Sequence, residues 1–260
     1  MTDSKYIESM EKAFDRLVEI YEEVSSDQIP VVDDGDFEFV AKLFLETQAE
    51  HLRAAKFLLK ARRYASARIL GRVMFEGMIF LLWINADRRD RAMKWRAWSA
   101  VTDWRLLREQ DAARVMVDDE YRKRVLDRAE QVRPVFARKT PRKGDPFKLT
   151  WTPTLPQMLE SLPHNALSLK ELYYPIYQLD SQLIHWTAAG LGSLLDRDGD
   201  ELKFVTDRQS DQVAAMNTAF HAAWHVIYNW GHWSGMELDG RLETIAKDYV
   251  KNYRGPTNAR

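Results

Sequence analysis

The chain of 260 residues contains no cysteine. This absence excludes disulfides, a thiolate metal site and a cysteine nucleophile. The sequence also lacks a glycine-rich phosphate loop, a dinucleotide-binding fingerprint and a Gly-x-Ser-x-Gly nucleophile elbow, so several common enzyme classes lose their sequence support. Its N-terminus has neither the basic start nor the apolar core of a signal peptide, and we therefore expect the protein to be cytoplasmic.

Alternation of polar and apolar residues, the pattern typical of strands, is found nowhere in the sequence. Apolar residues make up 45% of the chain, enough to bury a core, and they recur at helical spacing. We expect helices over residues 4–26, 37–60, 64–85, 88–108, 111–133, 210–233 and 241–253, and after capping boxes at Thr154 and Ser168, the second continuing to about Leu195. The sequence therefore predicts an all-α fold, a single multi-helix bundle over residues 1–260. Its parts are acidic helices (1–60), basic central helices (61–133), a basic loop (134–153) and C-terminal helices (154–260).

The longest apolar stretch, residues 64–84, carries Arg68, Arg72 and Glu76 at four-residue intervals. An apolar run of this length predicts a buried central helix, on which the three charged groups share one stripe. Burying an unpaired charge costs several kcal/mol, so these groups should pair or face a cleft. Glu76, one turn from Arg72, is its expected partner. The same charges count against a membrane span, and we expect no membrane contact.

Charge is distributed unevenly along the chain. Residues 1–50 carry a net charge of −10, residues 51–148 of +13 and residues 149–260 of −4. Such asymmetry indicates either an anionic partner for the basic middle third or an acidic first helix that lies across this third and neutralises it.

Basic and aromatic residues alternate in the segment 88–108, which contains Trp95, Trp98 and Trp104 among seven lysines and arginines. Cations interleaved with flat rings can bind phosphates and stack bases. The alternative is a helix with tryptophans toward the core and solvated arginines. Trp95 and Trp98 share a helix face, which favours that alternative.

The segment 133–153, RPVFARKTPRKGDPFKLTWTP, contains four prolines and a glycine and has a net charge of +5. We expect a long loop without regular structure. A mobile basic loop can hold an RNA or DNA backbone, although many such loops are only solvated surface. The residues predicted to bind nucleic acid are Arg138, Lys139, Arg142, Lys143 and Arg68.

Three histidines, His221, His225 and His232, can share one stripe of a helix, so a metal site is one interpretation. Hydrogen-bonded histidines beside tryptophan are the other, because the glutamate of the hydrolytic zinc motif is absent. The segment 196–200 fails the calcium-loop pattern and predicts a simple turn. We assign no metal and no cofactor.

Three segments carry a resemblance to a known family: ARRYASARILGRVMFEGMIFLLWI, WTPTLPQMLESL and YYPIYQLDSQLIHWT. Over about residues 50–195 the chain resembles the bacterial family of unknown function DUF5677. In that family an Arg-x-x-x-Glu helix precedes a Tyr-x-x-x-Ser-x-x-x-His helix. The resemblance therefore implies a site made of Arg72, Glu76, Tyr177, Ser181 and His185.

The family also looks distantly like the HEPN group of helical bundles, many of which are RNases in toxin–antitoxin or antiviral systems. A HEPN-like core is thus expected, but this chain departs from the usual motif. An arginine should precede the histidine by four to six residues, and Leu179, Asp180 and Ser181 stand there instead. Arg72 or Arg68 would have to replace it in space.

If the helix with Arg72 and Glu76 meets the segment with His185, His185 would act as general acid or base. Arg72 would then stabilise the phosphorane charge, and Glu76 would orient Arg72. Tyr177 and Ser181 would hold substrate or fix the imidazole tautomer. The alternative is a buried polar network that locks two helices in register. The predicted function is RNA or nucleotide binding, with activity as a metal-independent RNase. A non-enzymatic helical protein-interaction module is the alternative, and a homodimer is a further partner considered.

Overall fold

The computed structural model describes residues 4–26, 36–142, 144–162, 167–174, 176, 181, 185, 188–198, 200–205 and 207–251. These residues contain ten helices and four short strands. The helices are α1 (Ser4–Ser26), α2 (Asp36–Lys60), α3 (Tyr64–Asn85), α4 (Arg88–Ala112), α5 (Asp119–Phe136), α6 (Leu155–Ser161), α7 (Leu167–Tyr173), α9 (Ala188–Gly192), α10 (Gln209–Ser234) and α11 (Asp239–Val250). The strands are β1 (Ala137–Arg142), β2 (Asp145–Phe147), β3 (Leu195–Asp198) and β4 (Glu201–Phe204). The predicted all-α fold is confirmed, with two small hairpins added.

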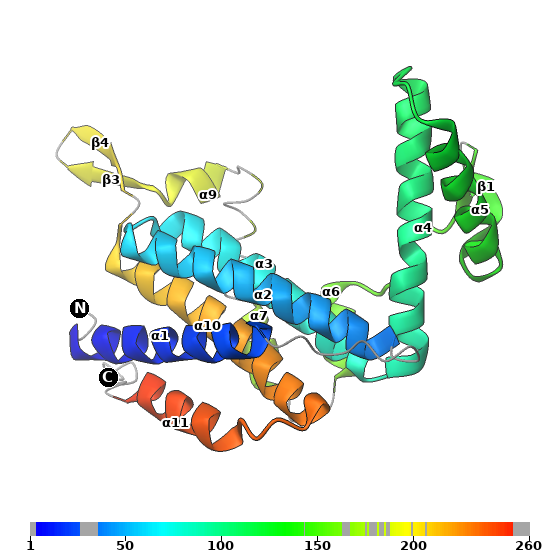
Figure 1. Cartoon of the computed structure of the whole chain (residues 1–260). Coiled ribbons are helices and arrows are strands. Elements are labelled where there is room, and N and C mark those ends of the chain that lie inside the picture. Colours follow the sequence, from blue (N-terminus) through cyan, green and yellow to red (C-terminus); the bar gives the residue numbers. More distant parts are fainter. Residues whose placement is uncertain are drawn as a thin grey trace.

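The helices α1, α2, α3, α10 and α11, with α6 and α7 beside them, form a bundle that we call the body. Its central element is α3, as predicted from the apolar sequence of this helix. It packs mainly against α10 and α2, which also contact each other (Figure 1), and only Ser66 and Val73 among its residues are exposed. Two glycines allow its neighbours to approach closely. A Cβ on Gly71 would lie 3.2 Å from Thr218 of α10, and one on Gly77 would lie 3.3 Å from Gln48 of α2.

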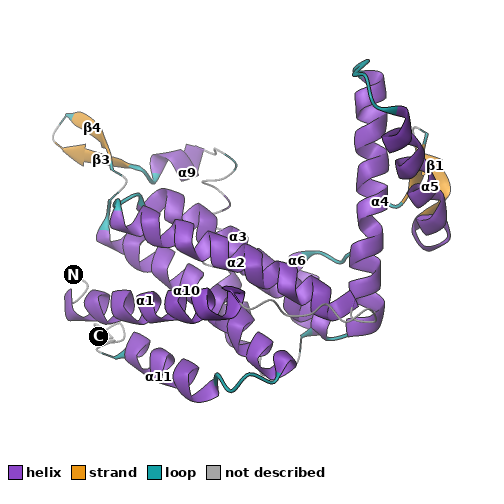
Figure 2. Cartoon of the chain, in the orientation of Figure 1, coloured by secondary structure: helices purple, strands orange, loops and turns teal. Residues whose placement is uncertain are grey.

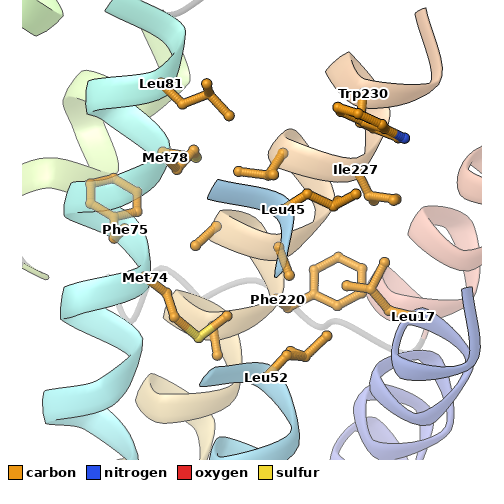
Figure 3. Close-up of a cluster of buried hydrophobic side chains, with 14 of the residues drawn as sticks. Leu17, Leu45, Leu52, Met74, Phe75, Met78, Leu81, Phe220, Ile227 and Trp230 are labelled. Atoms are coloured by element: carbon orange, nitrogen blue, oxygen red, sulfur yellow. The ribbon is translucent and has the colours of Figure 1, made fainter. Parts of the chain in front are cut away.

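The core of the body is a continuous apolar cluster to which α1, α2, α3, α10 and α11 contribute most of the side chains, with further ones from α6 and α7. Each large side chain buried there contributes about 1.5–3 kcal/mol relative to exposure. Figure 3 shows part of this cluster. The side chains labelled in it are Leu17, Leu45, Leu52, Met74, Phe75, Met78, Leu81, Phe220, Ile227 and Trp230.

The acidic helix α1 packs against α11, α10 and α2. The buried hydroxyl of Tyr21 donates to the carbonyl of Ala223 over 2.8 Å and ties α1 to α10. In Figure 1, α4 and α5 point away from α1. The interpretation that an acidic first helix covers the basic middle third is therefore wrong for α4 and α5.

The helices α4 and α5 and the hairpin β1–β2 form a projection that we call the arm (Figures 1 and 2). Its small core consists of four buried residues, Val101, Ala129, Phe136 and Phe147. Trp151, which follows the hairpin, packs against both this cluster and the core of the body. It therefore lies where the arm joins the body.

The prediction of a loop over residues 134–153 is partly wrong, because α5 continues to Phe136 and a hairpin follows it. Tertiary contacts overcome the prolines: Nε of Arg105 in α4 donates to Asp145 over 3.0 Å, and Phe147 is buried. Gly144 adopts a φ of +77° beside the turn, a conformation that glycine tolerates. The helix predicted from residue 111 begins at Asp119, because the side chain of Asp118 caps it.

The sequence does not predict the second hairpin, β3–β4. Residues 196–198 of the predicted turn belong to β3, and the pairing of Asp198 with Glu201 places the reversal of the chain after them. The single helix predicted to continue to about Leu195 is wrong at its end, because Leu195 belongs to β3. Within the predicted range the described residues contain two separate short helices, α7 and α9. The capping box of α6 is confirmed, since the amide of Thr154 donates to Gln157 over 2.9 Å. Among the described helices, not one combines the length and the apolar content needed to cross a membrane.

Candidate functional site

The charged stripe on α3 is paired within the protein. Nη2 of Arg72 lies 2.7 Å from Oε1 of Glu76, one turn further along the helix. The side chain of Arg72 is 7% exposed, whereas that of Glu76 is 34% exposed. The predicted pairing of Arg72 with Glu76 is confirmed, and Glu76 is the more exposed residue of the pair.

Arg68, the first residue of this stripe, forms an ion pair that sequence reasoning missed. Its Nη1 lies 2.6 Å from Oδ1 of Asp211, and both side chains are only 12% exposed. Asp211 lies in the first turn of α10, where the helix dipole favours a carboxylate. The pair links α3 to α10, and a phosphate at Arg68 would have to compete with it.

The second half of the predicted catalytic site comes from the segment after α7. Tyr177 lies outside the described residues. The amide of His185 donates to the carbonyl of Ser181 over 3.0 Å, so these two residues share a helical turn. Ser181 is half-buried and His185 is exposed. That this turn meets Arg72 and Glu76 stays a prediction.

Of the residues predicted to bind nucleic acid, Arg138, Lys139 and Arg142 lie on the first hairpin, whereas Arg68 lies on α3. Arg138 is half-buried and Lys139 is exposed, both on β1. Arg142 ends β1 opposite Asp145, and Lys143 lies outside the described residues. The pairing of β1 with β2 and the bond from Arg105 to Asp145 hold the hairpin against α4, so Arg138, Lys139 and Arg142 are not on a free loop.

A groove of about 610 Å³ lies where the arm meets the body. Its aromatic lining comes from Phe39 of α2, Phe80 of α3, Trp95 and Trp98 of α4, and Trp151. All five side chains are half-buried. Trp95 and Trp98 pack against apolar neighbours, as one interpretation of the segment 88–108 predicts, and they also line the groove. That they stack bases stays a prediction.

The histidines of α10 have different surroundings. Burial lowers the pKa of His221, and burial together with the neighbouring His221 lowers the pKa of His225 to about 4. Near the end of the helix, Nε2 of His232 lies 3.7 Å from Asp239. Within the described part of the chain, the structure contains no group of three histidine, aspartate or glutamate side chains that could hold a metal ion.

Fold and site together define a helical bundle whose central helix carries paired charges and whose side bears a basic arm. The chain belongs to the family of unknown function DUF5677, whose model matches residues 38–202, more than half of its length. The resemblance to that family is therefore confirmed. No curated protein and no solved structure matches the chain, so the HEPN-like core stays a prediction.

Proposed function

We propose that the chain binds RNA or nucleotides and that the arm makes the phosphate contacts. The observation that carries this proposal is the charge of the arm. Residues 88–148 contain 18 lysines and arginines against 10 aspartates and glutamates, a net charge of +8. The acidic helix α1 packs elsewhere, on α2, α10 and α11. An uncovered basic projection attracts a polyanion and releases its counterions on binding.

Several cations of the arm are exposed and can reach a phosphate chain. They include Arg114 at the tip, Lys123 and Arg124 on α5, and Lys139 on β1. Arg124 lies 3.9 Å from Glu120, and both side chains are largely exposed, so this pair costs little to open. These four residues are therefore the first candidates for backbone contacts.

A salt series tests this proposal. We expect the triple variant Lys123→Gln/Arg124→Gln/Lys139→Gln to bind single-stranded RNA more weakly and to lower the slope of log K against log salt by about 2, because each lost phosphate contact removes about 0.7. Fluorescence anisotropy with labelled RNA measures both quantities. The control Lys12→Gln/Lys247→Gln/Lys251→Gln removes the same charge from the body. Equal losses in both variants, or no binding by the wild type, would refute the proposal.

The finer proposal is that the chain is a metal-independent RNase of a toxin–antitoxin or antiviral system, with His185 as general acid or base and Arg72 stabilising the transition state. The exposure of His185 and the pairing of Arg72 with Glu76 support it. We expect His185→Ala to abolish RNA cleavage in the presence of a chelator while leaving the melting temperature unchanged. A lower melting temperature would indicate a structural network instead.

An interaction module is favoured by one observation, the exposed apolar face of the hairpin β3–β4. Leu195 pairs with Phe204 across the hairpin, and side chains two residues apart share a face, so Leu202 lies on the same side. These side chains are 41%, 66% and 68% exposed, in that order. A second copy of the chain is the proposed occupant. Leu202→Ser/Phe204→Ser should then abolish a dimer seen by analytical ultracentrifugation.

A further inference from the structure

We infer that the groove between arm and body binds a nucleotide unit by stacking its base on Trp95, Trp98 or Trp151 and pairing its phosphate with Arg96 and Arg128. This inference rests on the proposed RNA or nucleotide binding and assigns it a specific site. The groove volume of about 610 Å³ falls within the usual range for small-ligand sites, about 300–1,000 Å³.

The aromatic lining of the groove is held in place from behind. Trp98 packs edge-on against Phe136 at 5.1 Å between ring centroids, and Trp151 packs against Trp83 at 5.5 Å. Trp95 packs against Phe44 at 5.7 Å. Rings fixed by their neighbours lose little conformational entropy when a ligand binds, and base stacking on aromatic side chains is tolerant of base identity.

Two guanidinium groups lie at the groove on different elements, Arg96 on α4 and Arg128 on α5. Their side chains are 49% and 51% exposed. Arg96 is paired with Asp36 at the start of α2, and Arg128 with Asp103. These carboxylates orient the guanidinium groups.

The hydrogen bonds of Arg96 and Arg128 leave N–H donors of both guanidinium groups available for a phosphate. Arg128 uses Nη1 toward Asp103 at 3.1 Å and Nη2 toward the hydroxyl of Ser99 at 2.8 Å. A guanidinium carries five N–H donors, and among the described residues these bonds account for two of them in Arg128 and one in Arg96. Arginine matches phosphate geometry with two parallel hydrogen bonds, so both residues can bind a phosphate at the groove.

The combination of flat rings with guanidinium groups separates this groove from a plain basic surface. A polyphosphate would use the cations alone, whereas a nucleotide uses both kinds of side chain. A free nucleotide and a nucleotide within a single strand share this chemistry. The experiment therefore compares free AMP, a ten-residue oligoadenylate and an abasic oligomer of the same length and charge.

We expect oligoadenylate to bind about tenfold more tightly than the abasic oligomer, the effect of one stacked base, and to quench tryptophan fluorescence. Arg128→Gln should reduce this preference to less than about threefold, because it removes the phosphate contact beside the stacked base, whereas the cations of the whole arm share the abasic oligomer. The matched control is Arg124→Gln, the same change one turn earlier on α5, which should weaken both oligomers equally. A second pair of variants keeps the contact between Arg128 and Asp103. In this pair, Ser99→Glu should weaken oligoadenylate binding more than Thr102→Glu does.

The outcomes separate this inference from the proposed function. Equal affinity for the two oligomers, without quenching, would overturn the groove assignment and leave charge-based binding by the arm intact. No binding of AMP or of either oligomer would overturn both. Binding and quenching by AMP alone would identify a free nucleotide as the ligand, which supports the groove and contradicts a single strand. Preference for oligoadenylate over AMP supports both.

Discussion

The body and the arm of this molecule are stabilised in different ways. The body buries a continuous cluster that spans five long helices and includes the fully buried Leu17, Leu45, Met78 and Ile79. The separate apolar cluster of the arm has only four buried members. Three ion pairs hold α4 to α5 and the hairpin instead, and they are Arg105–Asp145, Arg122–Asp111 and Arg128–Asp103.

This difference relates stability to the proposed function. Apolar burial supplies most folding energy, so the body can fold without help from its surface charge. Partly exposed ion pairs contribute little each, so the arm should open locally at a lower free energy than the body unfolds. An element of low local stability and high positive charge is suited to adapt to an anionic ligand.

The largest expected effect concerns the core of the body. Phe75→Ala removes a ring that is 1% exposed and should lower the free energy of unfolding by about 3–5 kcal/mol. Chemical denaturation followed by far-UV circular dichroism measures the change. A loss below about 1 kcal/mol would mean that α3 is not the centre of the core.

The matched change in the arm is Phe147→Ala, at a side chain that is 2% exposed and packs against Trp104. We expect faster amide hydrogen exchange in α5 and the hairpin, with exchange in α3 and α10 unchanged. If both variants instead lower one common transition by similar amounts, body and arm form a single cooperative unit and the comparison fails.

The buried ion pair between α3 and α10 gives the next effect. Asp211→Ala removes the carboxylate that pairs with Arg68, at a site where both side chains are 12% exposed. Breaking such a pair should cost about 3 kcal/mol. The control is Arg68→Leu/Asp211→Leu, which removes both charges and should recover most of the loss. A double variant as unstable as the single one would contradict an electrostatic origin.

A smaller effect should depend on pH. Burial, with a contribution from His221, lowers the pKa of His225 to about 4, whereas in the unfolded chain the value is near 6.5. Between these values the unfolded state binds the proton and the folded state does not. The stability contribution is therefore complete above pH 6.5 and is lost as the pH falls to about 4.

At 1.36 kcal/mol per pH unit, the difference between the two pKa values corresponds to a loss of about 3 kcal/mol in the free energy of unfolding. We expect a loss of about 2 kcal/mol, because the imidazole is only half-buried. Denaturation at pH 7.0, 5.5 and 4.5 measures it. His225→Gln should flatten the profile over this range. A variant that loses stability as steeply as the wild type would assign the acid sensitivity to other groups.

Sequence reasoning identified the body better than the arm, for a physical reason. The bounds of α1, α3 and α10 follow from apolar periodicity, a local signal. The hairpin β1–β2 depends on Arg105, which is 40 residues from Asp145 in sequence. The pair Arg68–Asp211 spans 143 residues. Contacts of this kind require the fold, and a single sequence does not reveal them.

The same limit applied to the candidate sites. The four-residue spacing of Arg72 and Glu76 predicted their pairing, because it is a property of one helix. The groove combines residues of α2, α3, α4 and α5 with the segment after the hairpin. Only the alternation of arginine and tryptophan in α4 indicated it, and that signal did not distinguish a packed helix face from a binding surface.

The smallest expected effect tests whether charged contacts support the arm at all. Arg105 donates to Asp145 over 3.0 Å and to the carbonyl of Lys148 over 2.5 Å, with its side chain 27% exposed. We expect Arg105→Ala to cost about 1 kcal/mol, visible as faster exchange of the Lys148 amide, which bonds to Phe136. Arg133→Ala, at an exposed pair with Glu130, should cost no more than about 0.5 kcal/mol. Equal exchange rates in the two variants would mean that the small apolar core holds the hairpin alone, and the contrast between a hydrophobic body and a charge-supported arm would no longer stand.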